Sequence, residues 1–306
     1  MGDNVRRGAR EGWYLRRRLL AVLTIAMLVS LGATVPALAE DGSVEPQVVG
    51  GTPVPDGKYP FMTSLQADTS QRPPYEEHFC GGTLIDQISV LTVAHCVDFI
   101  GIRTDNDTLS YRDVRLVVGV TVLSSSQGKV RRIDRLSDIS IHSDYNGRTS
   151  SRYDAAVIEL GSPVRGIAPI ALAGVGSDEL ETPGRPATVT GWGNTIAQPP
   201  VGPGGPQDYP KRMREAQPPL VSDADCERSY GRDFHPKLMV CARQTGMDTC
   251  QGDSGGPMFV EATSGTRRQI GITSFGYGCG ATGFPGVYTE VNAEPVFNFI
   301  RRAAGR

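Results

Sequence analysis

The chain has 306 residues, a formal net charge of −2 at pH 7 and 21% charged residues, with 37 glycines and 22 prolines. This composition is typical of a loop-rich globular protein and excludes a disordered or coiled-coil chain. The weak net charge also gives no electrostatic argument for nucleic acid or an anionic membrane as a partner. Length alone is compatible with one or two domains.

The first 39 residues have the pattern of a signal peptide. Arginines are frequent before residue 19, residues 19–31 form an apolar stretch, and Ala37-Leu38-Ala39 offers small residues at the cleavage position. The pattern predicts a secreted, extracellular protein that keeps no membrane segment after cleavage. An uncleaved anchor is the alternative, although the stretch is shorter than the ~20 residues that a span needs. Arg16-Arg17-Arg18 followed by leucines leaves open a twin-arginine export route.

From residue 48 onward, short apolar runs alternate with turn signals. Residues 88–93, 115–122 and 269–275 are examples, whereas helical spacing is scarce until residues 295–302. The pattern predicts an antiparallel all-β fold of sandwich or barrel type with a C-terminal helix at about 294–303. Segment 66–77 contains Pro73-Pro74, and segment 197–210 is rich in proline and glycine; both are interpreted as surface insertions.

Three residues in these segments are candidates for nucleophilic catalysis. Ser254 lies within residues 248–257 (DTCQGDSGGP), where flanking glycines let a carbonyl approach and let backbone N–H groups converge. His95 follows the run 88–93, and Asp154 opens another apolar run. A serine hydroxyl becomes nucleophilic when a histidine takes its proton, and a carboxylate then orients that histidine. Taken singly, each has a structural alternative: a tight turn for Ser254, a structural role or metal ligation for His95, and a turn for Asp154.

All six cysteines follow the leader: Cys80, Cys96, Cys226, Cys241, Cys250 and Cys279. An even number in an exported chain predicts disulfides, and the count alone permits fifteen pairings. Zinc is the alternative for cysteine and histidine together, but no CxxC or HxxxH spacing occurs. We therefore expect no metal site and no cofactor.

Six segments in order resemble the trypsin/chymotrypsin family of serine proteases, and most of all the secreted bacterial trypsins. They are VVGG at 48–51, CGGTLI at 80–85, AHC at 94–96, GWG at 191–193, GDSGGP at 252–257 and PGVY at 285–288. The chain order of His, Asp and Ser is also that of this family. The resemblance implies two packed six-stranded antiparallel β-barrels, at about 48–165 and 166–292. It also implies a monomeric protease domain over 48–306, preceded by a short propeptide at 40–47.

The resemblance assigns a role to each candidate. Ser254 is the nucleophile of a serine endopeptidase, His95 its general base and Asp154 the carboxylate that orients the base. The backbone N–H groups of Gly252 and Ser254 form the oxyanion hole. The implied disulfides are Cys80–Cys96, Cys226–Cys241 and Cys250–Cys279.

The resemblance also implies specificity for Arg or Lys before the cleaved bond. Asp248 takes the place of the carboxylate at the base of the primary pocket, and Gly276 and Gly286 take the places of its walls. Ser274 is expected to hydrogen-bond Asp154. Phe275 stands where relatives carry Trp, so an aromatic platform for the substrate is kept. Burial of Asp248 would be unfavourable without a cationic substrate to pair with it.

The resemblance further implies that activation creates an ion pair between the new amino group of Val48 and Asp253. Pro46-Gln47 precedes Val48, whereas the zymogens of this family are commonly cut after Arg or Lys. We therefore expect a different activating protease, in addition to protein or peptide substrates and protein protease inhibitors as partners. Residues 119–128, which match the calcium loop of animal trypsins, contain no Asp or Glu and predict no calcium site there.

Two other functions are compatible with the same fold. A non-catalytic binding protein is one, but such proteins usually lose a triad member, and this chain has all three. An esterase is the other, since it shares the triad chemistry. Asp248 in a pocket of trypsin type favours peptide substrates.

Overall fold

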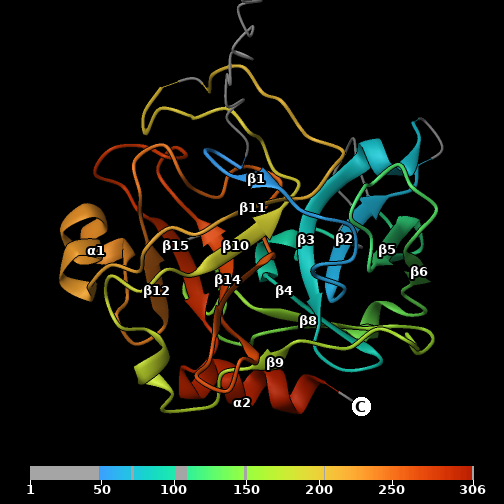
Figure 1. Ribbon diagram of the computed structural model, residues 1–306. Helices are drawn as coiled ribbons and strands as arrows, with labels where there is room; N and C mark the ends of the chain where they lie inside the picture. Colours follow the sequence, from blue (N-terminus) through green and yellow to red (C-terminus); the bar gives the residue numbers. More distant parts are fainter. Residues whose placement is uncertain (1–47, 70–71, 101–108, 148–149, 203, 305–306) are drawn as a thin grey trace, which may run out of the picture. The chain divides into compact units, whose positions relative to one another are not determined.

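The computed structural model describes residues 48–69, 72–100, 109–147, 150–202 and 204–304 (Figure 1). The predicted signal peptide at 1–39 and propeptide at 40–47 lie outside these residues. Within the described ranges, no helix has both the length and the apolar character that crossing a membrane requires.

The first sheet is built from β2 (Met62–Ala67), β3 (His78–Leu84), β4 (Ser89–Thr92), β5 (Val114–Val118), β6 (Lys129–Arg132), β7 (Ile139–Ile141) and β8 (Ala156–Glu159). Its order is β6-β5-β2-β3-β4-β8-β7, and every neighbouring pair is antiparallel. In β4 and β8 nearly every residue is buried, so both lie in the core.

The second sheet is built from β1 (Thr52–Pro53), β9 (Ala171–Leu172), β10 (Thr188–Gly191), β11 (Arg214–Ala216), β12 (Met239–Ala242), β13 (Pro257–Glu261), β14 (Arg267–Phe275) and β15 (Gly286–Glu290). Its order is β1-β11-β10-β13-β14-β15-β12, and β9 pairs with β14 in the one parallel contact of this sheet. The segment after Val48 thus joins the second sheet through β1.

These two curled antiparallel sheets confirm the expected all-β, chymotrypsin-like fold. The sheets have seven and eight strands, where six in each barrel was expected. The excess in the second sheet consists of β1 and β9, which are two residues long and have too few side chains to produce an alternating pattern.

Two α-helices are present in the described chain. α2 (Glu294–Ala303) lies where the apolar spacing predicts a helix, and it buries Val296, Phe299 and Ile300. α1 (Asp223–Tyr230) was not expected, because its sequence is mostly polar and lacks an apolar stripe. A cap signal marks its start, since Ser222 accepts a hydrogen bond from the backbone N–H of Asp225.

Six short 3₁₀ helices complete the described secondary structure: η1 (Pro74–Glu77), η2 (Ala94–Cys96), η3 (Tyr111–Asp113), η4 (Leu136–Asp138), η5 (Asp178–Leu180) and η6 (Gly231–Asp233). The predicted insertion at 66–77 is therefore shorter than expected, because residues 66–67 belong to β2 and residues 74–77 form η1.

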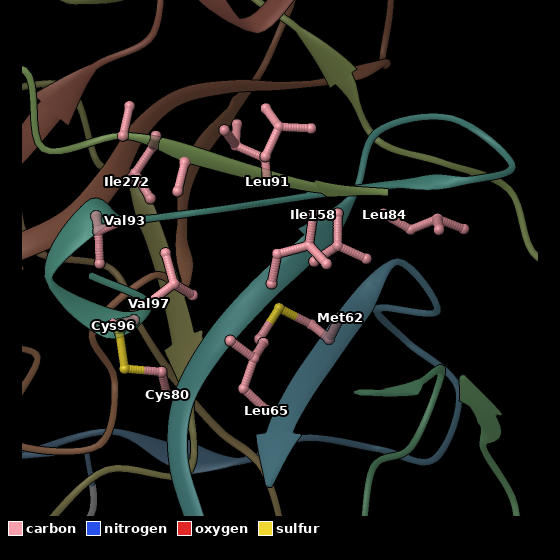
Figure 2. Packing of buried hydrophobic residues seen from close by; sticks show 14 of the residues in the cluster. Met62, Leu65, Cys80, Leu84, Leu91, Val93, Cys96, Val97, Ile158 and Ile272 are labelled. Atoms are coloured by element: carbon pink, nitrogen blue, oxygen red, sulfur yellow. A yellow bond between two sulfur atoms is a disulfide. The ribbon is translucent and has the colours of Figure 1, made fainter. Parts of the chain in front are cut away.

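The main apolar core extends across both sheets. Met62, Leu65, Leu91 and Ile158 pack together in the first sheet, and Ile272 of β14 belongs to the same cluster (Figure 2). Burying one such side chain contributes roughly 1.5–3 kcal/mol. This packing fixes the end of β4, from which the chain enters η2.

The structure has three disulfides with the pairing that the resemblance implies: Cys80–Cys96, Cys226–Cys241 and Cys250–Cys279. The first joins β3 to η2, which carries His95. The third joins the segment before Ser254 to the loop between β14 and β15. Each of these two bridges thus holds a segment that carries a candidate site residue.

Candidate active site

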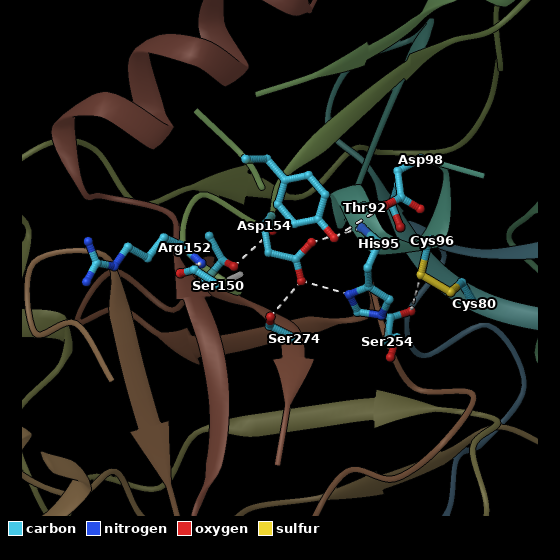
Figure 3. Close-up of polar contacts among 12 residues, drawn as sticks. Cys80, Thr92, His95, Cys96, Asp98, Ser150, Arg152, Asp154, Ser254 and Ser274 are labelled. Atoms are coloured by element: carbon cyan, nitrogen blue, oxygen red, sulfur yellow. Dashed lines mark hydrogen bonds and ion pairs between the residues drawn. A yellow bond between two sulfur atoms is a disulfide. The ribbon is translucent and has the colours of Figure 1, made fainter. Parts of the chain in front are cut away.

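His95 and Asp154 are brought together by the pairing of β4 with β8. Thr92 lies opposite Ala156 in this pair, so the residues just beyond these two positions are neighbours. Asp154 accepts two hydrogen bonds from His95, one from the backbone N–H to Oδ1 at 3.0 Å and one from Nδ1 to Oδ2 at 2.7 Å (Figure 3). Because a carboxylate only accepts, Nδ1 holds a proton, and in the neutral imidazole the lone pair is therefore on Nε2.

Asp154 is 1% exposed, and its acceptor positions are filled from both sheets. Ser274 Oγ, on β14, donates to Oδ2 at 2.6 Å. Thr289 Oγ1, on β15, donates to the backbone carbonyl of Asp154 at 2.9 Å. Hydrogen bonds that satisfy a buried carboxylate keep it oriented.

Ser254 is held beside His95 by contacts to the first sheet. Its carbonyl accepts a hydrogen bond from Gly81 N at 2.7 Å and lies 3.7 Å from Cys96 Sγ. Figure 3 shows Ser254 next to the imidazole of His95. Between these two described side chains there is no hydrogen bond, a common situation in unliganded enzymes, where such contacts tighten when substrate binds.

The backbone around Ser254 needs glycine. Gly252 and Gly255 have φ of +96° and +81°, a region that strains residues with side chains. A Cβ at Gly255 would also lie 2.1 Å from Thr92 Oγ1. No backbone hydrogen bond among the described residues uses the N–H of Gly252 or Ser254, so both are available to a substrate oxygen.

His78 supports this loop and was not singled out from the sequence. Its Nε2 donates to the carbonyl of Gly252 at 3.0 Å, and its Nδ1 lies 2.8 Å from Ser64 Oγ. Burial lowers the pKa of His78 to about 4, so it is neutral at physiological pH. Its only sequence signal was its place at the start of a strand, two residues before Cys80.

The pKa of His95 is raised above its ordinary value. Burial alone would lower the pKa, but the hydrogen bond and charge of Asp154, together with the charge of Asp98, outweigh that effect. Asp98 is a second residue that sequence reasoning missed. It lies just after η2, and Tyr145 Oη is 3.5 Å from its Oδ2. Its position near His95 depends on how the chain turns after η2, which no local pattern reveals.

Asp248 lines a cavity of about 170 Å³ that opens beside Ser254, together with Ser274, Phe275, Gly276 and Gly286. Asp248 is 5% exposed, and burial raises its pKa to about 7, although hydrogen bonds from Thr249 N and Gly280 N oppose this rise. A Cβ at Gly286 would lie 2.5 Å from Asp248 Oδ1. Glycine at that wall therefore leaves the carboxylate free to face the cavity.

Asp253 is 1% exposed and points away from this cavity, toward Gly193. It accepts hydrogen bonds from Gly193 N at 2.8 Å and Cys250 N at 3.0 Å. Burial nevertheless raises its pKa to about 6. Among the described residues no cation pairs with it, and the nitrogen of Val48 is in a peptide bond with Gln47. The Val48 side chain is buried in the apolar cluster of the second sheet.

The ligand atoms of Cys80, His95 and Cys96 lie within 4.8 Å of one another, an arrangement that could hold a metal ion. Both sulfurs are joined in a disulfide, however, and a disulfide offers no thiolate to a metal. His95 also uses Nδ1 for Asp154. The donor set therefore does not fit a metal ion.

Comparisons with known proteins agree with this geometry. The family model described as Trypsin matches residues 48–300. The chain belongs to the trypsin family. A trypsin of Saccharopolyspora erythraea is 37% identical over 248 residues, covering 80% of this chain and 94% of the relative. A trypsin-like protease of Streptomyces glaucescens is 32% identical over 285 residues, covering 92% of this chain and 91% of the relative. Trypsin-1 of Astacus astacus is 33% identical over 250 residues, covering 80% of this chain and 95% of the relative. This trypsin-family chain is a serine endopeptidase that acts on protein substrates.

Proposed function

We propose that the chain is a secreted zymogen whose active form cleaves peptide bonds after Arg or Lys through Ser254, His95 and Asp154. The supporting geometry is the hydrogen-bonded pair of His95 and Asp154 beside Ser254, next to a cavity with a buried carboxylate. The extracellular location rests on the leader pattern in residues 1–39.

In the proposed reaction, Ser254 Oγ attacks the carbonyl carbon while His95 Nε2 takes its proton. The negative charge that develops on the carbonyl oxygen is stabilised by the N–H groups of Gly252 and Ser254. His95 then gives the proton to the leaving amine, and an acyl-enzyme remains on Ser254. A water molecule then attacks the acyl-enzyme with the help of His95 in the same way, and this releases the acid and restores Ser254. Asp154 stabilises the imidazolium that forms in each half of the reaction.

Specificity for Arg and Lys rests on Asp248. A buried carboxylate whose pKa is raised to about 7 gains most from a cation, because a paired charge offsets the loss of hydration. A guanidinium can form two parallel hydrogen bonds with a carboxylate, which favours Arg over Lys. The small walls at Gly276 and Gly286 leave room for a long side chain.

Activation is proposed to occur by cleavage after Gln47. The new amino group of Val48 pairs with Asp253, which is buried and has no cation paired with it among the described residues of the unprocessed chain. The active form is a monomer, and its partners are the activating protease and protein inhibitors that occupy the cleft. Because Gln47 does not suit a pocket that selects Arg or Lys, the activating protease is a different enzyme.

The observation that carries this proposal is the cavity formed by Asp248 beside Ser254. The test is hydrolysis of matched chromogenic peptides ending in Arg, Lys, Phe or Ala, by protein whose N-terminal residue is shown to be Val48. We expect cleavage after Arg and Lys only, with loss of that activity in Asp248→Ser and Ser254→Ala. Cleavage after Phe or Ala at comparable rates would contradict the specificity.

A further inference from the structure

The residue directly before Asp154 has a backbone conformation that is rare for its type. Tyr153 has φ of +56°, and Val48 is the only other non-glycine residue with positive φ among those that the structure describes. A left-handed conformation brings Cβ close to the backbone, so a bulky residue adopts it only where its surroundings hold it there. Such outliers gather at functional sites. Contacts around Tyr153 must therefore hold it in place.

The left-handed turn at Tyr153 sets the direction of the chain where it enters β8. The carbonyl of Tyr153 accepts a hydrogen bond from Ala155 N at 2.8 Å, which closes a tight turn around Asp154. The carbonyl of Ala155 accepts one from His142 N at 3.1 Å, just beyond the last paired residues of β7 and β8. The Asp154 side chain leaves this turn toward His95 (Figure 3). A rotation at Tyr153 would therefore move the carboxylate that holds His95.

An aromatic stack holds the ring of Tyr153. The ring centroid lies 4.7 Å from that of His142, with 20° between the two planes, which is a stacked arrangement. The His142 ring also contacts Phe299 of α2, at a centroid distance of 5.0 Å and an angle of 54°. Aromatic pairs at these separations favour particular relative orientations and add stability beyond that of apolar burial. The stack therefore opposes rotation of Tyr153 out of its left-handed conformation.

His142 is itself fixed, so it can act as a support. It is 5% exposed, its Nδ1 accepts a hydrogen bond from Asp144 N at 3.2 Å, and its Nε2 lies 3.4 Å from the carbonyl oxygen of Pro295. Because Nδ1 accepts, the proton of the neutral ring is on Nε2, from which it is donated to that carbonyl. Pro295 lies in the first turn of α2. The stack thus connects the residue before Asp154 to the C-terminal helix.

The groups around His142 keep it neutral at pH 7 and above. Burial lowers the pKa of His142, as does the charge of Arg302 on α2, whereas the hydrogen bond to Pro295 and the charge of Asp144 oppose this. The net result is a pKa below the ordinary value. A neutral ring keeps the lone pair on Nδ1 that the N–H of Asp144 needs. The support is therefore intact in the pH range where a neutral His95 acts as a base.

We propose that Tyr153 is a positioning residue for Asp154, and that its ring, stacked on His142, holds the turn from which the carboxylate leaves. The inference rests on the proposed triad and adds two residues outside it. Ser274 fixes an oxygen atom of the carboxylate, whereas Tyr153 fixes the backbone that carries it. The ring of Tyr153, and not its hydroxyl, serves this role.

Two substitutions separate the ring from the backbone conformation. Tyr153→Phe keeps the ring, and Tyr153→Gly removes it while allowing φ of +56° without strain. Each protein is processed to a Val48 N-terminus and assayed, beside the unmodified enzyme, on a chromogenic Arg arylamide. Tyr153→Phe should retain kcat. In Tyr153→Gly kcat should fall at least about threefold with KM nearly unchanged, because a looser Asp154 weakens the base and leaves the primary pocket as it was.

The pH profile gives a readout that a loss of stability alone would not move. Burial lowers the pKa of His95, but the hydrogen bond and charge of Asp154, together with the charge of Asp98, outweigh it. A looser Asp154 raises this pKa less, so the acidic limb of kcat/KM should move to lower pH in Tyr153→Gly. The limb should stay in place in Tyr153→Phe.

A second variant and a matched control assign the effect to the stack. His142→Gln removes the imidazole but keeps a donor and an acceptor, and it should shift the acidic limb in the same direction. The double variant with Tyr153→Gly should be about as slow as Tyr153→Gly alone, because both changes remove one stack. Tyr111→Gly is the control, since Tyr111 is also partly buried against the main apolar core but lies in η3. It should lower the melting temperature and leave kcat and the acidic limb unchanged.

The outcomes separate this inference from the proposed function. If the unmodified enzyme cleaves the Arg arylamide and Tyr153→Gly has the same kcat and the same acidic limb, the role of Tyr153 is overturned and the proposed function stands. A loss that Tyr153→Phe shares, or that adds fully to the loss in His142→Gln, would also overturn it. Failure of the processed, unmodified enzyme to cleave the arylamide would overturn both.

Discussion

Ser274 Oγ donates a 2.6 Å hydrogen bond to Asp154 Oδ2 across 120 positions of sequence. Asp154 precedes β8 of the first sheet, whereas Ser274 lies on β14 of the second. The carboxylate that holds His95 is thus itself held by the opposite sheet. The orientation of the candidate base therefore depends on the packing between the two sheets.

Ser274→Ala is expected to lower kcat about tenfold, because a hydrogen bond to a buried carboxylate contributes roughly 1.5–3 kcal/mol. Steady-state kinetics on an Arg arylamide measures the effect. Ser274→Thr, which keeps a hydroxyl, is the matched variant and should retain more activity than Ser274→Ala. Equal kcat for the unmodified enzyme and Ser274→Ala would show that the hydrogen bond does not orient Asp154.

Asp98→Asn is expected to move the acidic limb of the kcat/KM profile to lower pH. The Asp98 charge favours the imidazolium form of His95 and raises its pKa, so removing that charge lowers the pKa. The base then stays unprotonated at more acidic pH. Asp144→Asn is the control, because Asp144 acts on His142. An unchanged acidic limb in Asp98→Asn would show that the charge of Asp98 does not affect the pKa of His95.

Binding of a small guanidinium or amidine ligand is expected to weaken as the pH falls through about 7. The cation needs the ionised form of Asp248, whose pKa burial raises to about 7 before any ligand binds. Below that pH, affinity should fall by about tenfold per pH unit, since one proton competes with the ligand. Calorimetry with the Ser254→Ala protein measures this dependence, and Asp248→Asn should abolish both the binding and its pH dependence.

Glu181→Gln is expected to stabilise the protein at alkaline pH. Burial, with the charges of Glu290 and Asp178, raises the pKa of Glu181 to about 9. Because the pKa of Glu181 is higher in the folded than in the unfolded chain, the folded chain binds the proton of Glu181 more tightly. The stability that comes from this proton is fully present below about pH 4.5 and is lost as the pH rises through about 9. The variant should melt at least about 2 °C higher than the unmodified protein at pH 8.

The control for this effect is Glu179→Gln, at a neighbouring exposed position. Its melting temperature should not change between pH 5 and pH 8 relative to the unmodified protein. A gain in Glu181→Gln that is as large at pH 5 as at pH 8 would mean that ionisation of Glu181 is not its cause.

Processing by an enzyme of the same specificity is expected to fail at Val48. The Ser254→Ala precursor, which cannot process itself, should yield no Val48 terminus with trypsin, because Gln47 precedes the bond. A protease that accepts Gln before the bond should produce it. N-terminal sequencing reads the result, and a Val48 terminus produced by trypsin alone would sink the prediction of a different activator.

Much of the fold class was predictable from local patterns. Alternating apolar runs indicated strands, and the spacing of residues 295–302 indicated α2. α1 was missed because its buried residues form no apolar stripe, and a two-residue strand such as β1 has no pattern to read. Patterns of burial are visible only where an element is long enough to repeat them.

The sequence by itself determined which residues could carry the chemistry: the glycines around Ser254, the order of His95, Asp154 and Ser254, and an even set of cysteines. Only the tertiary structure decided the support that Ser274 gives to Asp154 and the hydrogen bond from His78 to the carbonyl of Gly252. It also decided that the distant segments of Tyr75 and Tyr209 line one hollow. A local pattern records which face of a strand is buried. It does not record which remote strand or loop covers that face, because such contacts form only when both sheets pack.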